Sequence, residues 1–224
     1  MRYKTCITIG QKTPKKLVQF ANKALQKSEF VELRLDFLNP KDVPRTLELL
    51  KNKRKKLVCT LRPKTEGGKF SGSEKERLSI IKLISEYDPY LLDVEYKAIR
   101  TNHSLKKYLR NSNLLVSWHD FKKTPLSKQL FRQLSQMRKQ SKNVKIVTTA
   151  KTLNDVARIL SLYSKSQGLN LIAFAMGDIG RISRILSIYL GSPYAYVSFG
   201  KAIAPGQLSL EELRKILTLN PKQV

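Results

Sequence analysis

The chain has 224 residues, of which 41% are hydrophobic, and carries 43 Lys and Arg against 17 Asp and Glu, a formal charge of +26. This composition can bury a sizeable core, yet no run reaches the ~18 apolar residues of a membrane span. The N-terminal sequence MRYKTCITIG becomes strand-like too early for a signal peptide, so we expect a cytoplasmic protein outside the membrane.

Strand and helix patterns alternate along the chain. Short β-branched and apolar runs predict strands at 5–9, 30–37, 57–61, 90–96, 114–118, 144–149, 169–175 and 194–199. Amphipathic stretches after each run predict helices at 14–26, 44–51, 73–86, 104–110, 127–140, 153–165, 179–190 and 209–217. Ser73 and Glu76 have capping-box spacing at the start of the third helix.

Eight strand-then-helix units in succession predict an α/β protein with the architecture of a (β/α)8 TIM barrel. An open doubly wound sheet is the alternative, but it would usually carry a GxGxxG turn after an early strand, and the sequence has none. No linker, low-complexity stretch or shift in composition divides the chain. We therefore expect one barrel domain over residues 1–224.

The basic charge raises the possibility of a nucleic-acid partner. The lysines, however, are spread over every predicted helix, and no zinc-finger, RNP-type or basic-zipper pattern occurs. The one dense run, KNKRKK at 51–56, joins a helix to a strand and is expected to be a solvated connection. Cys6 and Cys59 fall in predicted buried strands without metal-ligand spacing, so we expect reduced core thiols and no metal site.

Polar residues gather where the predicted strands end, which is where TIM barrels place their active sites. Glu32, Arg34 and Asp36 share one face of the second strand, because side chains alternate along a strand. The other polar residues at or after strand ends are Arg62, Glu66, Asp93, Glu95, His119, Asp120, Lys201 and Gln207. The connections at the opposite end carry mainly lysine, and this sorting points to a functional site.

Lys145 lies within a β-branched run, NVKIVTTAK at 143–151, that otherwise predicts a buried strand. Either the strand begins after Lys145, or the amine is held in a dry interior, where lysine is rare unless paired. In the second case we expect desolvation and the nearby Arg34 or Arg62 to leave part of the amine neutral and nucleophilic. A neutral amine can form an imine with a carbonyl, and the protonated imine is an electron sink.

His119 ends the strand next to that of Lys145 and is the candidate proton carrier, since imidazole titrates near neutral pH. The alternative is a hydrogen-bonded core histidine without a chemical role. His103 and Lys151 are expected on the surface at helix starts, and Met176 is expected to pack around the site.

Six motifs then occur in order: ELRLD at 32–36, TLRPKTEGG at 60–68, SWHDF at 117–121, VKIV at 144–147, GRISRI at 180–185 and KAIAPGQ at 201–207. ELRLD or HDF alone would be weak evidence. The ordered set covers essentially the whole chain and resembles type I 3-dehydroquinate dehydratases.

This resemblance implies dehydration of 3-dehydroquinate to 3-dehydroshikimate in the shikimate pathway of aromatic amino-acid biosynthesis, without metal or organic cofactor. It implies that Lys145 forms a Schiff base with the C3 ketone and that His119 carries the proton in a syn elimination. Glu66 would orient or tune the histidine, and Arg184 would hold the substrate carboxylate. The further substrate-binding residues would be Glu32, Arg34, Arg62 and Gln207.

One residue departs from the family pattern. Many members have a serine before Ala-Pro-Gly-Gln, where this chain has Ile203. A missing hydroxyl contact to substrate is worth about 1 kcal/mol by ordinary hydrogen-bond magnitudes. It therefore bears on affinity rather than on the class of reaction.

Two other functions stay open from the residues alone. One is a Schiff-base aldolase acting on a phosphosugar, because AMGDIG and SFGKA follow the seventh and eighth strands, where such barrels bind phosphate. The other is a basic nucleic-acid-binding barrel without activity. The sequence does not decide the oligomeric state, for which a homodimer is one candidate.

Overall fold

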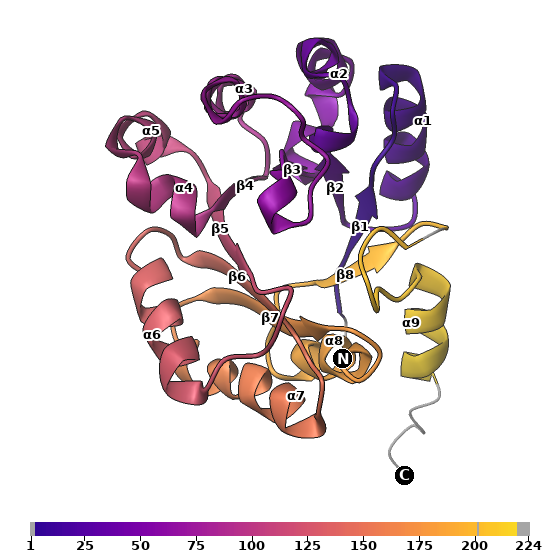
Figure 1. Cartoon of the computed structure of the whole chain (residues 1–224). Coiled ribbons are helices and arrows are strands. Elements are labelled where there is room, and N and C mark those ends of the chain that lie inside the picture. The colour runs from indigo at the N-terminus through magenta and orange to yellow at the C-terminus, as the bar shows by residue number, and fades with distance from the viewer. Residues whose placement is uncertain (1–2, 201, 219–224) are drawn as a thin grey trace.

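The structure, a computed structural model, describes residues 3–200 and 202–218 and is built around eight parallel strands (Figure 1). The strands are β1 (Thr5–Ile9), β2 (Phe30–Arg34), β3 (Leu57–Thr60), β4 (Leu91–Glu95), β5 (Leu114–His119), β6 (Asn143–Thr149), β7 (Asn170–Met176) and β8 (Ala195–Ser198). Each is short and largely buried, as expected for strands covered on both faces.

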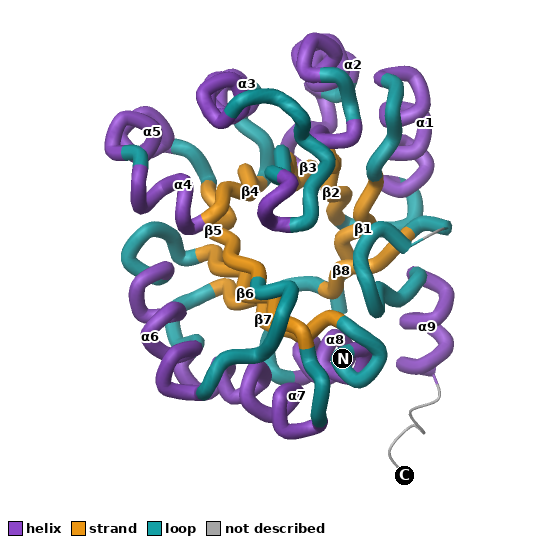
Figure 2. Tube along the Cα trace, in the orientation of Figure 1, coloured by secondary structure: helices purple, strands orange, loops and turns teal. Residues whose placement is uncertain are grey.

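The strands follow chain order across the sheet, β7-β6-β5-β4-β3-β2-β1-β8, and the last strand pairs in parallel with the first. Figure 2 shows this sheet curled into a ring that is enclosed by helices. The expected (β/α)8 barrel is confirmed. All carboxyl ends of the strands consequently open on one end of the ring.

Helices surround the ring. They are α1 (Pro14–Leu25), α2 (Val43–Leu49), α3 (Glu74–Glu86), α4 (Tyr96–Thr101), α5 (His103–Tyr108), α6 (Ser127–Met137), α7 (Leu153–Leu160), α8 (Arg181–Tyr189) and α9 (Leu210–Thr218). Ser73 caps α3 by accepting a hydrogen bond from the Glu76 amide at 3.1 Å. Thr152 and Asp155 form a reciprocal capping box at the start of α7.

Most predicted elements begin and end within two residues of the observed ones, but some elements differ. The helix predicted at 104–110 is found as α5 followed by a 3-10 turn at Leu109–Asn111, but the preceding helix α4 was not predicted. The two helices meet at Asn102, whose side chain accepts from the Leu105 amide. The helix predicted to 165 ends at Leu160 and continues as a 3-10 turn. The strand predicted to Phe37 ends at Arg34, so Asp36 lies in a 3-10 turn rather than on the strand face.

Buried hydrophobic residues form two clusters. The larger one joins the outward faces of the strands to the helices, for example Val31 and Leu33 with Leu17 and Ala21. The smaller one includes Cys6, Val58, Leu115, Ile172 and Tyr196. These five residues have the same strand parity as the polar site residues, so we place the smaller cluster inside the ring.

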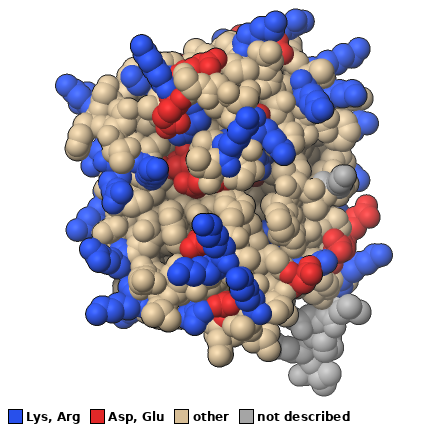
Figure 3. Space-filling model, in the orientation of Figure 1, with Lys and Arg blue, Asp and Glu red and all other residues tan. Residues whose placement is uncertain are grey.

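Lysine and arginine side chains are spread around the face seen in Figure 3 rather than gathered in one patch. The dense run Lys51–Lys56 is a 3-10 connection with no buried residue, as expected for a solvated segment. Cys6 and Cys59 are buried free thiols. Among the described residues, no helix combines the length and apolar character needed to cross a membrane.

Candidate active site

A cleft of about 640 Å³, counted with its open mouth, lies at the carboxyl ends of the strands. Every site residue predicted from the sequence lines this cleft: Glu32, Arg34, Arg62, Glu66, His119, Lys145, Arg184, Ile203 and Gln207. These residues come from segments far apart in the chain, and the curl of the sheet brings them together.

Lys145 lies inside β6, paired in register with Ser117 on one side and Ile172 on the other. The strand begins at Asn143, so the alternative in which it starts after Lys145 is wrong. The residue is only 6% exposed. Its ammonium lies 4.1 Å from the centroid of the Tyr196 ring, a favourable position for a cation. The amine is therefore held in the interior of the barrel.

Two carboxylates make ion-pair contact with Lys145, and the two arginines expected nearby, Arg34 and Arg62, line the same cleft. The Nζ of Lys145 lies 3.5 Å from Glu32 Oε1 and 3.5 Å from Asp93 Oδ2. Thr60 donates a hydrogen bond to the same oxygen of Glu32 at 2.9 Å. Two carboxylates so close stabilise the ammonium in the interior and would stabilise a positive charge on the same nitrogen in an imine.

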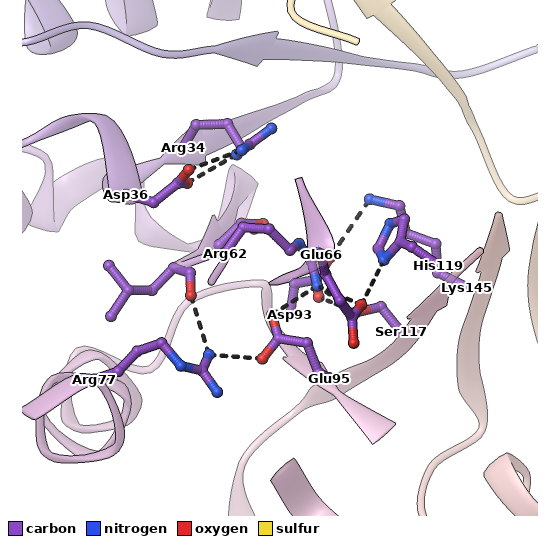
Figure 4. Close-up of polar contacts among 12 residues, drawn as sticks. Arg34, Asp36, Arg62, Glu66, Arg77, Asp93, Glu95, Ser117, His119 and Lys145 are labelled. Atoms are coloured by element: carbon purple, nitrogen blue, oxygen red, sulfur yellow. Dashed lines mark hydrogen bonds and ion pairs between the residues drawn. The ribbon is translucent and has the colours of Figure 1, made fainter. Parts of the chain in front are cut away.

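His119 and Glu66 form a hydrogen-bonded pair at the rim of the cleft, with Nδ1 2.9 Å from Oε2 (Figure 4). Burial raises the pKa of Glu66 to about 7, although Arg62 opposes the rise. Burial also lowers the pKa of His119 well below its ordinary value, helped by Arg62 and Lys145. The imidazole is therefore neutral near pH 7, and the contact fixes which of its nitrogens faces the cleft.

The segment that carries Glu66 needs glycine at two positions. Gly67 follows the 3-10 turn Lys64–Glu66 with φ of 73°, a left-handed conformation that glycine adopts readily. A side chain on Gly67 would meet the Phe121 ring at 2.5 Å, and one on Gly68 would meet the Arg62 carbonyl at 1.9 Å. The motif EGG thus lets the segment turn tightly against the His119 strand end.

Arg62 connects the floor of the cleft to two carboxylates of β4. Its Nη2 donates to Asp93 at 2.6 Å, and its Nη1 donates to Glu95 at 2.7 Å and to Ser117 at 2.7 Å. Burial acts to lower the pKa of Arg62, but Asp93 and Glu95 outweigh it, so the pKa lies above the ordinary value. Ser117 also donates to Asp93 at 2.6 Å, which closes the network.

Arg184 differs from Arg62 because it has no ion-pair partner among the described residues. It is 5% exposed, lies over the Phe174 ring at 4.1 Å, and donates one hydrogen bond to the Pro205 carbonyl at 3.2 Å. Its Nε is buried without a partner. Burial lowers the pKa of Arg184 to about 10, with a contribution from Arg181. A buried, unpaired guanidinium facing a cleft is suited to bind an anion.

The remaining predicted residues shape the cleft wall. Arg34 binds Asp36 through two hydrogen bonds of 2.8 Å, so Asp36 supports the arginine instead of facing the cleft beside it. Gln207 donates to Thr8 at 3.2 Å and accepts from the Ile203 amide at 3.1 Å. Gln207 therefore ties the segment that follows β8 back to β1.

Some residues singled out from the sequence lie away from the cleft. His103 and Lys151 are exposed, as expected, and Asp120 accepts from the Lys122 and Lys123 amides. Lys201 is outside the described residues. Met176, by contrast, lines the cleft, in agreement with the packing position expected for it. Metal-binding clusters are absent from the described ranges as a whole, in which no group of three His, Cys, Asp or Glu side chains is arranged to hold a metal ion.

The cleft also contains residues to which the sequence assigned no role: Thr8, Thr60, Phe121, Val147, Phe174 and Tyr196. Alternation along each strand could have identified several of them. Thr60 lies two residues before Arg62, and Val147 two residues after Lys145, so each shares a face with a candidate site residue. Phe121 follows its strand, and no periodic signal covers it.

Comparison with known proteins gives consistent matches over most of the chain. The sequence profile described as type I 3-dehydroquinase matches residues 5–223. The chain is 41% identical over 194 residues to the 3-dehydroquinate dehydratase of Pyrococcus abyssi, covering 86% of this chain and 87% of that protein. It is 31% identical over 226 residues to the same enzyme of Desulfotalea psychrophila, covering 97% and 98%.

Solved structures of 3-dehydroquinate dehydratases also align with this chain over most of its length. The type I 3-dehydroquinate dehydratase of Clostridium difficile, with covalently modified comenic acid, aligns with a TM-score of 0.85 at 26% identity, covering 97% of this chain and 92% of that chain. The 3-dehydroquinate dehydratase of Geobacillus kaustophilus aligns with a TM-score of 0.87 at 23% identity, covering 99% and 93%.

The two buried arginines of the cleft should respond differently to replacement. Arg62→Met is expected to lower the free energy of unfolding by about 3–5 kcal/mol, because it leaves two buried carboxylates without their cation. Arg184→Met is expected to cost less than about 1 kcal/mol or to stabilise the empty protein, because it removes an unpaired buried cation and keeps the packing volume. Urea unfolding followed by circular dichroism measures both, and equal losses would contradict this assignment of partners.

Proposed function

Because this chain belongs to the type I 3-dehydroquinase family, we propose that it is a hydro-lyase that dehydrates 3-dehydroquinate to 3-dehydroshikimate in the shikimate pathway. We further propose that the reaction is a syn elimination through a Schiff base on Lys145. The observation that carries this proposal is the buried amine of Lys145, in the same cleft as the His119–Glu66 pair. The solved structure of the Clostridium difficile relative contains covalently modified comenic acid, which supports covalent chemistry in this family.

The reaction can be written so that every atom is accounted for. The neutral amine of Lys145 adds to the C3 carbonyl, and loss of water gives a protonated imine. His119 removes the C2 proton, and the electron pair moves into the imine to form an enamine. The enamine expels the C1 hydroxyl, which leaves as water with the proton returned by His119. Water then hydrolyses the imine and restores the amine.

Two features of Lys145 suit this sequence. The carboxylates of Glu32 and Asp93, each 3.5 Å from Nζ, hold the amine at a fixed place in the cleft. They also stabilise the positive charge that returns when the imine is protonated, and the Tyr196 ring does the same from 4.1 Å. The amine therefore keeps the same partners in the resting and imine states.

Glu66 sets the state of His119. When the carboxylate is ionised, it accepts a hydrogen bond from the Nδ1–H group. Nε2 then carries no proton and is free to take the C2 proton. When the carboxyl is protonated it can donate to Nδ1 instead, and the remaining ring proton then occupies Nε2. The base form of the pair thus requires ionised Glu66.

The substrate carboxylate has a natural partner in Arg184. A buried guanidinium without an ion-pair partner among the described residues gains more from an anion than a paired one does. Arg34, Arg62, Glu32 and Gln207 are proposed to contact the substrate hydroxyls. Ile203 cannot add a side-chain hydrogen bond, so affinity should rest on the other contacts.

The two alternatives considered from the sequence find less support. A phosphosugar aldolase would need a phosphate site after β7 and β8, but Arg184 lies within α8 and faces the same cleft as Lys145. A nucleic-acid-binding barrel would not need a buried amine beside a histidine–carboxylate pair. The match of the family profile over residues 5–223 favours the dehydratase over both.

Borohydride should trap the imine on one lysine. Incubation with 3-dehydroquinate and borohydride is expected to add one reduced adduct, located on Lys145 by mass spectrometry of the intact protein and its peptides. Lys145→Ala should lose the adduct, whereas the surface control Lys151→Ala should be labelled like the unchanged protein. An adduct that persists in Lys145→Ala would refute the assignment of the nucleophile.

Removal of the proton carrier should separate imine formation from elimination. His119→Ala is expected to form the borohydride-trapped adduct still, while turnover falls by ~10²–10⁴-fold, the usual contribution of general acid–base catalysis. Steady-state assays of 3-dehydroshikimate formation measure the loss. His103→Ala, an exposed histidine, is the control and should keep full activity. Full activity in His119→Ala would show that another group moves the proton.

The pH dependence should report the ionisation of Glu66. Because the base form needs ionised Glu66, kcat/KM is expected to fall as the pH falls through about 7, the pKa to which burial raises this carboxyl. Glu66→Gln retains an oxygen that can accept from Nδ1 but cannot titrate, so the acid limb at this pH should disappear. If the profiles of the two proteins superimpose, the limb belongs to a different group.

A further inference from the structure

Arg77 is a buried arginine outside the cleft, and it is fully engaged. It lies one turn into α3 and is 2% exposed. Its Nη1 donates to Glu95 at 2.6 Å and to the Leu61 carbonyl at 3.2 Å. Its Nε and Nη2 both donate to the Glu74 carboxylate at 2.8 Å. Burying a guanidinium costs several kcal/mol unless its partners are well placed, so this set of contacts needs an explanation.

Two of the three partners of Arg77 lie at the two ends of the segment that carries Glu66. Leu61 directly follows β3, and Glu74 is the first residue of α3. The residues between them, 62–73, include three glycines and therefore have little intrinsic stiffness. Arg77 joins both ends of this segment through one planar group, which restricts where Glu66 can lie.

Arg77 also reaches the cleft through Glu95. One oxygen of Glu95 accepts from Arg77, and the other accepts from Arg62 at 2.7 Å (Figure 4). Arg62 continues the chain to Asp93 at 2.6 Å, and Asp93 lies 3.5 Å from the amine of Lys145. An unbroken series of buried ion pairs thus runs from α3 to the nucleophile.

We propose that Arg77 is a positioning residue for the Glu66–His119 pair and for Arg62. It acts by two routes: it holds Glu95, which fixes Arg62, and it holds the ends of the segment that places Glu66. Arg77 is absent from the residues that line the cleft, so it acts on the reaction only through other residues. This inference rests on the proposed dehydratase function.

The charges around Glu66 make the role of Arg77 measurable. The charged and titratable groups that face Glu66 come from the segment after β3 and from β4, β5 and α3: Arg62, Asp93, Glu95, His119 and Arg77. The two arginines lower the pKa of Glu66, while Glu95 and Asp93 raise it in addition to the dominant effect of burial. Removing Arg77 takes away one of the two cations and leaves one oxygen of Glu95 unpaired. The acid limb should therefore move to higher pH.

The test compares three variants of the full-length chain. Arg77→Met removes the charge and all five donors, whereas Arg77→Lys keeps the charge but cannot bind three partners through a planar fork. Lys75→Met is the matched control, since it removes one positive charge from an exposed position of the same helix. For each protein, kcat, KM and the pH profile are measured with 3-dehydroquinate, and folding is checked by urea unfolding.

We expect kcat of Arg77→Met to fall about 10- to 100-fold, the effect typical of small misplacements of catalytic groups, with a smaller change in KM and an acid limb shifted to higher pH. Arg77→Lys should recover part of kcat and keep the limb near its original pH. Lys75→Met should match the unchanged protein. If Arg77 had only a structural role, Arg77→Met would lower the urea midpoint of unfolding without moving the acid limb of the pH profile.

Two outcomes would overturn the proposal. One is a folded Arg77→Met with unchanged kcat and pH profile. If Arg77→Met does not fold, Arg77→Lys decides, and its overturning result is a kcat equal to that of the unchanged protein. Failure of the dehydratase function itself would be visible separately, because the unchanged protein would then show neither turnover nor the borohydride adduct on Lys145.

Discussion

The pairing of Arg62 with Asp93 and Glu95 is the interaction on which the rest of the cleft depends. Closing eight strands into a ring gives a volume in which water is scarce, and a charge there is tolerated only when its partner is present. Arg62 supplies that partner for two carboxylates at 2.6 and 2.7 Å. With Asp93 held in place, the amine of Lys145 has a defined anionic neighbour at 3.5 Å. Without Arg62, this part of the barrel would hold an excess of negative charge.

The inside of the ring is layered, and the layering follows from strand alternation. On four strands, an apolar residue comes two positions before a polar cleft or network residue on the same face: Cys6 before Thr8, Val58 before Thr60, Leu91 before Asp93, and Leu115 before Ser117. The apolar layer closes the barrel beneath the polar one. Solvent therefore meets Lys145 from the mouth of the cleft, and electrostatic contacts in the polar layer are stronger than they would be in water.

The sequence predicted the parts of this arrangement that follow from the regular spacing of apolar residues in strands and helices. Alternation of strand and helix patterns predicted the barrel. Several of the residues predicted at strand ends line the cleft, whereas Asp93, Glu95 and Asp120 do not. Arg77 was missed because a charged residue on an amphipathic helix is normally assigned to the solvent face, and only the tertiary structure shows that its side chain points inward to Glu95. The carboxylate neighbours of Lys145 were missed for a related reason. Glu32 and Asp93 lie 113 and 52 residues away in the chain, and the strand pattern does not specify which side chains meet across the ring.

The burial that makes an unpaired charge unfavourable also shifts the pKa values of Glu66 and His119 in opposite directions. It raises the pKa of Glu66 to about 7 and lowers that of His119 below its ordinary value, so the usual order of a carboxyl and an imidazole is reversed. A proton shared across the 2.9 Å contact can then rest on the carboxyl while the ring stays neutral. The lowered pKa of His119 keeps its ring in the neutral form, which is the form that can take a proton from carbon. The arginines around Glu66 limit how far its pKa rises, and in this way the paired cations of the barrel adjust the chemistry at its rim.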